Sequence, residues 1–531
     1  MQSDTLSIDR KKPRLMEQSL LRKRIFFYFI VFSASAFFPL FISSKCSVLY
    51  PFNDWPDINT FFTMGKGMLH GKILYADMVD QKGPYVFALF ALGYALSHTT
   101  FHGVFVLEWL FMCFSLYQIY RIISLYTTQP DRYLWIYPIF CSAIAGSKSF
   151  VHGGSVEEFF ICIYLYGIYT LLALLRSASK EMPFRVFGIN GLLTAILFWS
   201  KYTVLGFYIA WLLIVMVTYL SHKKGKRLIQ GLLSYALGFF CATIPWICYF
   251  GIHHKIKIWL EVYLWDNIFR YSTTGNLNLL QKLGTALLLG IRSIKDVENL
   301  CYGVWIILGG LVFVFLPFRK VSLREKAALP VLGLFSILGI FIGGAVQDYY
   351  SLPLSAFFIV GILSIVVAGD FLLSSRQGKQ RTIPIVSTIL LLCSLAGSTY
   401  LDYRISSNTY LLSYSKMDMP QYQFAAVIKE SDDESVLNYG FLDGGFYTVL
   451  DQIPEMRYFC TLNVDYFGIL EEQNKYLEKE MTNWVVTWRG EITTEQELRQ
   501  IPVLTEHYEL VTYLYFPLES DYRTYALYRR K

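Results

Sequence analysis

Four aspartates and, after them, the last of three lysines occur within one short stretch near the N-terminus, DWPDINTFFTMGKGMLHGKILYADMVDQKGP, residues 54–84. They are Asp54, Asp57, Asp77, Asp80 and Lys82. An ionised carboxylate can accept a proton from an attacking hydroxyl or amine, and a lysine can hold a phosphate as a point charge. These residue types therefore indicate a site for a phosphate-linked substrate. The alternative, which the sequence leaves open, is that DMVDQKG is a solvated turn before a helix.

A helix is expected between the two pairs of aspartates, because apolar residues recur there at helical spacing. The apolar set is Ile58, Phe61, Phe62, Gly65, Met68 and Leu69, and the polar set is Asn59, Thr63, Lys66 and His70. Such an amphipathic helix, placed directly after a membrane-length apolar run, is predicted to lie in the membrane interface. At its start, Asp54 can be an N-cap, whereas Asp57 in the first turn gains only ~0.3–1 kcal/mol from the helix dipole.

The composition predicts an integral membrane protein. Of 531 residues, 54% are hydrophobic and only 16% are charged, and the mean hydropathy is +0.40. The net charge of +7 comes from short basic clusters between apolar runs, as the positive-inside rule expects, and is therefore no signal for nucleic acid.

Twelve apolar segments are candidate helices. Ten are strong, at residues 25–43, 103–120, 156–175, 187–200, 203–220, 228–250, 300–317, 329–344, 353–373 and 383–399, and two are weaker, at 84–98 and 133–147. Basic loops at 176–185, 222–227, 318–326 and 374–381 and the basic tail 1–24 are expected in the cytoplasm. Loop 44–84, Lys201 and everything after residue 400 are then outside. This topology requires one segment of the first third not to cross, and the short 84–98 is the first candidate, before 133–147.

The chain becomes polar after residue 400, and residues 401–531 are predicted to form a small extracytoplasmic α/β domain after the 25–400 membrane domain. Its predicted elements are helices at 419–430, from 444 and at 468–481, and strands at 435–440 and 484–488.

The order of these motifs resembles the GT-C superfamily of membrane glycosyltransferases, which includes protein O-mannosyltransferases and lipid A aminoarabinose transferases. The motifs are the aspartate that opens the amphipathic helix, ML-x-G, Y-x-D and KGP in the first loop, then GGSVEE, FWSKYT and DYYSLPL, and LNYGFLDGGFY in the last domain. The resemblance implies a polytopic α-helical fold with about 11–12 transmembrane helices in a bacterial cell membrane. It also implies an inverting transfer of a sugar from a polyprenyl-phosphate donor to an extracytoplasmic cell-wall polymer, glycolipid or protein.

The resemblance implies a role for each residue of this sequence that matches a family motif. Asp57 matches the first-loop catalytic carboxylate, with Asp54 as the alternative, and Lys82 matches the lysine that faces the donor phosphate. Gln81 stands where aminoarabinose transferases have an acidic residue, and Asp80 can substitute for it. The remaining expected substrate-binding residues are Asp77, Glu157, Glu158, Lys201, Tyr349 and Tyr350, although the two tyrosines are more typical of aromatic-belt anchors than of sugar contacts.

Other features give weaker signals. Glu108 lies inside an apolar run, where an acid is a functional candidate by default, but a helix-packing hydrogen bond is the favoured role. His253 and His254 lack zinc-site spacing, so no metal or other cofactor is predicted, and a divalent cation stays open. A disulfide between Cys46 and Cys460 is a further possibility.

Two other functions remain open. A transporter or flippase of a lipid-linked glycan would explain the many helices, but it predicts inverted repeats and broken midplane helices, which the sequence lacks. In a non-catalytic glycan-binding membrane protein, the loop carboxylates would be dispensable.

Overall fold

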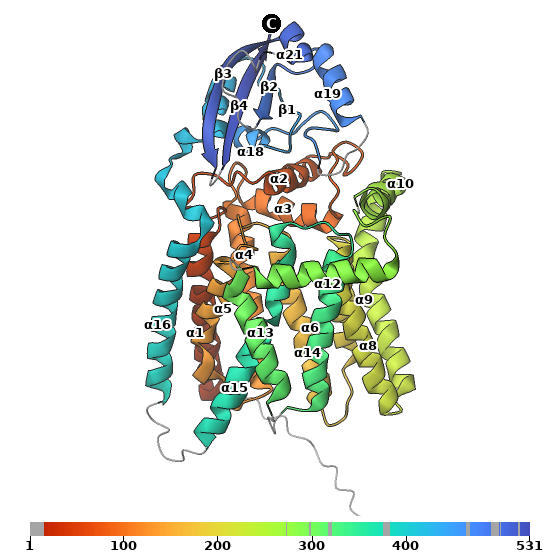
Figure 1. Cartoon of the computed structure of the whole chain (residues 1–531), viewed down its shortest axis with the longest axis vertical. Helices are drawn as coiled ribbons and strands as arrows, with labels where there is room; N and C mark the ends of the chain where they lie inside the picture. The colour runs from red at the N-terminus through yellow and green to blue at the C-terminus, as the bar shows by residue number, and fades with distance from the viewer. Residues whose placement is uncertain are drawn as a thin grey trace, which may run out of the picture.

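The computed structural model describes residues 15–271, 273–296, 299–316, 321–374, 383–462, 468–489, 499, 501–518 and 521–531. A helical bundle carries a small α/β domain at one end (Figure 1). Most of the predicted basic tail and parts of the predicted loops 318–326 and 374–381 lie outside the described residues.

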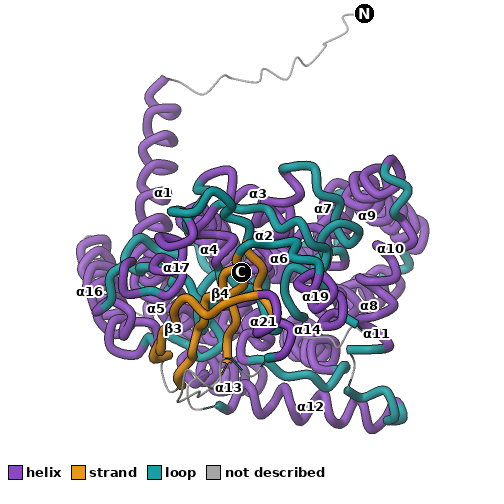
Figure 2. Tube along the Cα trace, turned by 90° about the horizontal axis from the view of Figure 1, so that it is seen from above, coloured by secondary structure: helices purple, strands orange, loops and turns teal. Residues whose placement is uncertain are grey.

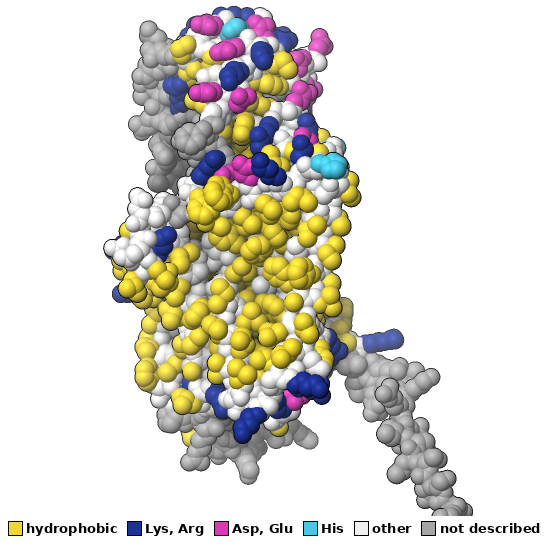
Figure 3. Space-filling view, turned by 90° about the vertical axis from the view of Figure 1, so that its right-hand side faces the viewer, with side chains coloured by type: hydrophobic (Ala, Val, Ile, Leu, Met, Phe, Trp, Pro, Cys, Tyr) yellow, Lys and Arg dark blue, Asp and Glu magenta, His cyan; other side chains and the backbone are white. Residues whose placement is uncertain are grey.

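Every apolar segment predicted to be helical is helical. The bundle helices are α1 (Leu15–Ser43), α3 (Pro84–Leu96), α4 (His102–Ser124), α5 (Ile136–Ala145), α6 (Glu158–Arg176), α7 (Phe184–Phe198), α8 (Gly206–Ser221), α9 (Gly225–Ile252), α13 (Leu300–Phe315), α14 (Leu323–Phe341), α15 (Ile359–Ser374) and α16 (Ile383–Ile405). Seven helices of the described chain are long and apolar enough to cross a membrane. On the face shown in Figure 3, apolar side chains form a broad band bordered at both ends by charged side chains, as expected for a protein that spans a bilayer.

Shorter elements connect the helices of the bundle. They are η1 (Pro130–Tyr133), η2 (Tyr202–Leu205), α10 (Ile256–Leu260), the π-helix η3 (Glu261–Asp266), α11 (Asn267–Phe269), α12 (Leu279–Lys295) and η5 (Asp348–Phe358). Helix α12 runs across the outside of the bundle rather than along it (Figure 1).

Helix α3 is held at the domain end of the bundle. On its N-terminal side, the Tyr75 carbonyl accepts a hydrogen bond from Arg457 of the last domain (3.1 Å). In its last turns, the Tyr94 hydroxyl donates to Asp451 of the same domain (3.1 Å). Both ends therefore lie at one end of the bundle, and the 13 residues span only about 20 Å. Without 84–98, eleven of the twelve predicted segments are left as crossings, which is the odd number that the predicted topology requires; the topology itself stays a prediction.

Helix α2 (Pro56–Leu69) corrects one prediction. Its apolar face packs on α3, with the Phe61 and Phe90 ring centroids 5.4 Å apart. Gly65 permits this close approach, since an added Cβ would lie 2.5 Å from the Ala91 backbone nitrogen. Its polar face meets the last domain, where Thr63 donates to Asp443 (2.7 Å). The helix is therefore enclosed by protein, and the predicted position in the membrane interface is wrong because protein groups, rather than water, satisfy its polar side chains.

The last domain is an α/β unit with a mixed four-stranded sheet in the order β1-β2-β4-β3. Its elements are η6 (Ser407–Ser413), η7 (Lys416–Asp418), α17 (Pro420–Ile428), β1 (Val436–Tyr439), α18 (Phe446–Leu450), α19 (Ile469–Glu478), β2 (Trp484–Arg489), α21 (Pro502–His507), β3 (Tyr508–Leu518) and β4 (Asp521–Arg530). Strand β1 pairs parallel to β2, and the other pairs are antiparallel. Seen from above, the sheet lies over the bundle (Figure 2). The predicted strands β1 and β2 are confirmed, whereas β3 and β4 were not predicted.

Candidate functional site

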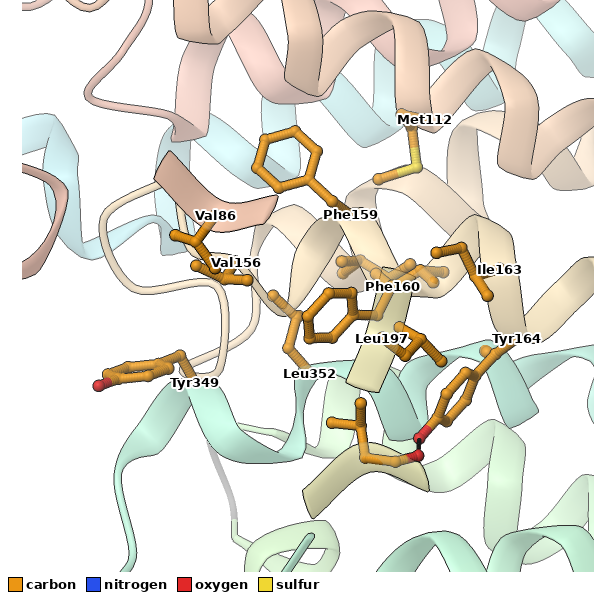
Figure 4. Packing of buried hydrophobic residues seen from close by; sticks show 14 of the residues in the cluster. Val86, Met112, Val156, Phe159, Phe160, Ile163, Tyr164, Leu197, Tyr349 and Leu352 are labelled. Carbon is orange, nitrogen blue, oxygen red and sulfur yellow. Dashed lines mark hydrogen bonds between the residues drawn. The ribbon is translucent and has the colours of Figure 1, made fainter. Parts of the chain in front are cut away.

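The first-turn carboxylate of α2 points into the junction between the loop and the bundle. Helix α2 begins at Pro56 after an extended Trp55 whose side chain makes no cap. Asp57 is 9% exposed, and its Oδ2 accepts a hydrogen bond from the Tyr349 hydroxyl (2.7 Å). Tyr349 lies at the edge of a buried apolar cluster with its hydroxyl directed away from that cluster (Figure 4). This hydrogen bond engages one carboxylate oxygen of Asp57 and fixes the direction of its side chain.

Asp54 does not cap the helix. Its Oδ1 pairs with Lys45 Nζ at 2.8 Å, and both side chains are almost fully buried. Burial alone would raise the pKa of Asp54, but Lys45 and His152 outweigh it and lower the pKa below its ordinary value. The N-cap interpretation is therefore wrong: Trp55 stands at the N-cap position, and Asp54 is one half of a buried ion pair with Lys45.

Two buried lysines lie beside Asp57. Lys201 pairs with Glu157, and its Nζ lies 3.3 Å from the Tyr350 ring centroid. Burial lowers the pKa of Lys201 to about 8, and the positive charge of Lys82 acts in the same direction. Burial alone would also lower the pKa of Lys82, but the negative charges of Glu157 and Asp57 outweigh it and raise the pKa.

These two lysines line a cavity of about 220 Å³ at the domain end of the bundle. Its polar lining includes Gln81, Ser200 and Tyr271, and its apolar lining includes Ile268, Ile340 and Ile342. Tyr350 also lines the cavity and shares a hydrogen bond with Tyr271 (2.9 Å). Two ammonium groups beside an apolar wall can hold a phosphate that carries a hydrocarbon chain.

Of the other predicted acids, only Asp80 and Glu157 belong to this site. Asp80 Oδ2 accepts from the Lys82 backbone (3.2 Å), and burial raises its pKa to about 6 against the opposing effect of Lys82. Asp77 instead accepts from the Ile73 backbone (2.8 Å), which closes its own turn.

Glu158 belongs to a different cluster. Its carboxyl meets that of Glu108 inside the bundle. Glu108 also accepts from Ser44 (2.8 Å) and from the Gly154 backbone (2.6 Å). The predicted helix-packing role of Glu108 is confirmed, because these contacts join α4 to the end of α1.

The aromatic-belt interpretation of Tyr349 and Tyr350 is wrong, because their exposed fractions are only 7% and 4%. The suggested disulfide is also wrong: Cys46 and Cys460 are both buried free thiols. Within the described residues, no group of three His, Cys, Asp or Glu side chains could hold a metal ion.

Sequence reasoning missed Lys45, His152 and Tyr271. Lys45 could have been identified, because a lysine at the predicted outer end of the first span is contrary to the positive-inside rule. A buried charge at such a position requires a partner of opposite charge. His152, whose ring stacks on Trp55 with the centroids 5.4 Å apart, and Tyr271 carry no signal in spacing or composition.

No family model and no curated protein matches the sequence. Among solved structures, ArnT from Cupriavidus metallidurans bound to undecaprenyl phosphate matches with a TM-score of 0.52 and 11% identity, over 97% of this chain and 98% of that chain. The chain has the GT-C fold. The predicted fold class is thereby confirmed.

Two further GT-C structures match at lower similarity. The arabinofuranosyltransferase AftD from Mycobacteria gives a TM-score of 0.45 at 12% identity, over 95% of this chain and 40% of that chain. The apo form of ArnT from Cupriavidus metallidurans gives 0.42 at 13% identity, over 96% and 98%.

Proposed function

We propose that the protein is a membrane glycosyltransferase that takes a sugar from a polyprenyl-phosphate donor and transfers it to an acceptor at the domain end of the bundle. The observation that carries this proposal is the cavity lined by Lys82 and Lys201, with the Asp57 carboxylate close enough to influence both ammonium groups. A phosphate leaving group needs positive charge, and the attack of an acceptor needs a base.

In this mechanism the acceptor hydroxyl attacks the anomeric carbon from the side opposite the phosphate. The new carbon–oxygen bond forms as the bond to the donor phosphate oxygen breaks, and Asp57 takes the acceptor proton. Lys82 and Lys201 stabilise the charge that develops on the leaving polyprenyl phosphate, and Glu157 positions Lys201. Tyr349 orients Asp57 through its hydrogen bond (2.7 Å). One bond forms and one breaks with inversion, and no redox partner is required.

The nature of the donor is supported by the solved structure with the same fold. ArnT was crystallised with undecaprenyl phosphate, which is a phosphate on a long hydrocarbon chain. The cavity in this chain suits both parts of such a molecule, since its lysines can bind a phosphate and its isoleucines can contact a hydrocarbon chain. The acceptor is proposed only as a hydroxyl or amine outside the membrane core.

The test uses the full-length protein in liposomes supplied with a radiolabelled pool of polyprenyl-phosphate sugars and with envelope extract as acceptor. We expect free polyprenyl phosphate to accumulate while label enters the acceptor fraction, and we expect Lys82→Met to abolish both. Lys72→Met, in the same loop but outside the cavity lining, is the matched control. Label that crosses the bilayer while still attached to its carrier would identify a flippase, and unchanged donor with no label movement would support a binding protein.

A further inference from the structure

A second cavity lies at the end of the bundle opposite the α/β domain. It encloses about 400 Å³ between α1, η1 and the first turns of α16. Its lining includes Arg24, Arg132, Asp131, Ser387, Thr388, Phe27, Leu134 and Leu391. Helix α16 begins at this second cavity and runs the length of the bundle to the α/β domain (Figure 1). The proposed donor cavity lies at that domain end. This second cavity therefore has no part in the proposed transfer.

The acidic group in this cavity has partners, whereas one of its arginines has a nitrogen atom without an acceptor. The Asp131 carboxylate interacts with α1, since Tyr28 donates to its Oδ1 (2.5 Å) and Arg24 Nη2 lies 3.6 Å from its Oδ2. Arg132 lies next to it in the chain, yet its Nε is buried and no described residue accepts a hydrogen bond from it. A buried guanidinium N–H without an acceptor costs free energy, so the site favours an anionic ligand that supplies one.

The side chains that line the cavity indicate which kind of molecule carries the anionic group. The apolar lining of the cavity includes Phe27 of α1, Leu134, and Leu391 of α16, and Ser387 and Thr388 of α16 add hydroxyl-bearing side chains. Helices α1 and α16 both present apolar side chains outward, among them Phe26 (64% exposed) and Ile385 (64% exposed). A ligand in this position meets a phosphate site and a hydrocarbon surface together, which is the chemistry of a phospholipid.

We propose that this cavity binds the phosphate of an anionic phospholipid, with Arg132 and Arg24 as its cationic ligands and the acyl chains along α1 and α16. The planar guanidinium group suits a phosphate because two N–H groups can reach two oxygens at once. On the topology predicted from the basic loops, the site faces the cytoplasmic leaflet, where anionic lipids attract basic residues near the surface.

The lipid would secure the helix that holds the α/β domain. Among the seven long apolar helices of the described chain, α16 has the smallest buried share, 11% of its apolar window against 28–83% for the others. A helix with so few protein contacts gains relatively more from a ligand that bridges it to α1 and η1. A ligand that binds only the folded state stabilises it by RT ln(1 + L/Kd), where L is the ligand concentration, so the unfolding midpoint rises as the ligand concentration exceeds Kd.

The test follows the thermal unfolding of the full-length protein, purified and delipidated in a neutral detergent, as phosphatidylglycerol is added. We expect the midpoint to rise with phosphatidylglycerol and to stay unchanged with phosphatidylcholine. Arg132→Gln should weaken the apparent affinity about fivefold, as expected for one basic residue at an anionic lipid. Arg185→Gln, an exposed arginine at the start of α7 outside the cavity lining, is the matched control and should change nothing.

Leu391→Trp gives an independent reading if Arg132→Gln fails to fold. It narrows the apolar part of the cavity, where the acyl chains would lie, and leaves every charge in place, so it should weaken the response to phosphatidylglycerol. Equal effects of the two lipids, or equal losses in Arg132→Gln and Arg185→Gln, would overturn the proposal in favour of nonspecific attraction. An equal response to inorganic phosphate would identify a soluble anion as the ligand, and retention of the response in Leu391→Trp would place the lipid elsewhere.

Discussion

The pairing of Asp57 with Tyr349 gives the sharpest prediction about catalysis. Asp57→Asn keeps the size of the side chain and an oxygen that can accept the Tyr349 hydrogen bond, but an amide cannot take a proton from the acceptor. General base catalysis contributes typically about 10²–10⁴-fold, so we expect the transfer rate to fall by that factor. The unfolding midpoint should change little, because the hydrogen bond and the packing of α2 survive.

The magnitude for Tyr349→Phe follows from the same contact. The lost hydrogen bond, 2.7 Å long and made to a nearly buried carboxylate, is of the charged kind that is worth about 1.5–3 kcal/mol. If that free energy serves to orient the base, the rate should fall about 10- to 100-fold. In the double variant the tyrosine has no base left to orient, so its rate should lie within roughly threefold of Asp57→Asn alone.

The assay measures polyprenyl phosphate released by each variant in liposomes, at saturating and subsaturating donor. Tyr439→Phe is the matched control, since it removes a partly buried hydroxyl that donates to Asn474 (2.6 Å) in the α/β domain. It should affect stability without affecting turnover. Full additivity of Asp57→Asn and Tyr349→Phe, or a control that slows transfer equally, would refute the assignment of Tyr349 as the residue that positions the base.

Three further predictions concern charge and topology. Donor affinity should weaken as the pH rises through about 8, the pKa to which burial lowers Lys201, and Lys201→Arg should remove this dependence in a donor titration. Asp54→Asn should lower the unfolding free energy by about 3–5 kcal/mol because it leaves Lys45 buried and unpaired. Since the pKa of Asp54 is lowered on folding, its stabilisation is complete above the unfolded pKa of about 3.9 and is lost as the pH falls below it, so acid titrations of wild type and variant should converge. A cysteine at the exposed position Asp432 should react with an impermeant reagent on intact cells, and labelling only after permeabilisation would reverse the predicted orientation.

The sequence predicted the bundle well because a membrane span leaves a long apolar run that is read directly from the chain. The terminal hairpin of β3 and β4 was missed although Tyr508–Leu518 and Asp521–Arg530 are rich in tyrosine and branched residues, which favour strands. A short polar turn between two such runs is a hairpin signal. This omission was therefore a fault of interpretation rather than a limit of the sequence.

The site was only partly predictable, for a physical reason. Spacing along the chain placed Asp54 and Asp57 together, but their roles depend on which cation lies nearest in three dimensions. Lys45 forms an ion pair with Asp54, and Glu157 forms one with Lys201, which is 44 residues away in the sequence. No local pattern encodes pairs of this kind, because they arise when α1, α6 and the segment after α7 pack against the loop.

The α/β domain contributes to the site through α2 rather than through residues in the cavity. Asp57 stands at one end of α2, and Lys66 at the other end is fully buried, donating to the Tyr447 carbonyl (2.7 Å) and lying 3.6 Å from Asp451. Lys82 follows α2 in the same loop, whereas Lys201 and Tyr349 belong to the bundle. The distance between the proposed base and the proposed phosphate ligands is therefore set by how α2 sits between α3 and the domain. A misplacement of about 1 Å in such a constellation can cost about 10²-fold in rate, so a domain whose described residues do not line the cavity can still govern the chemistry.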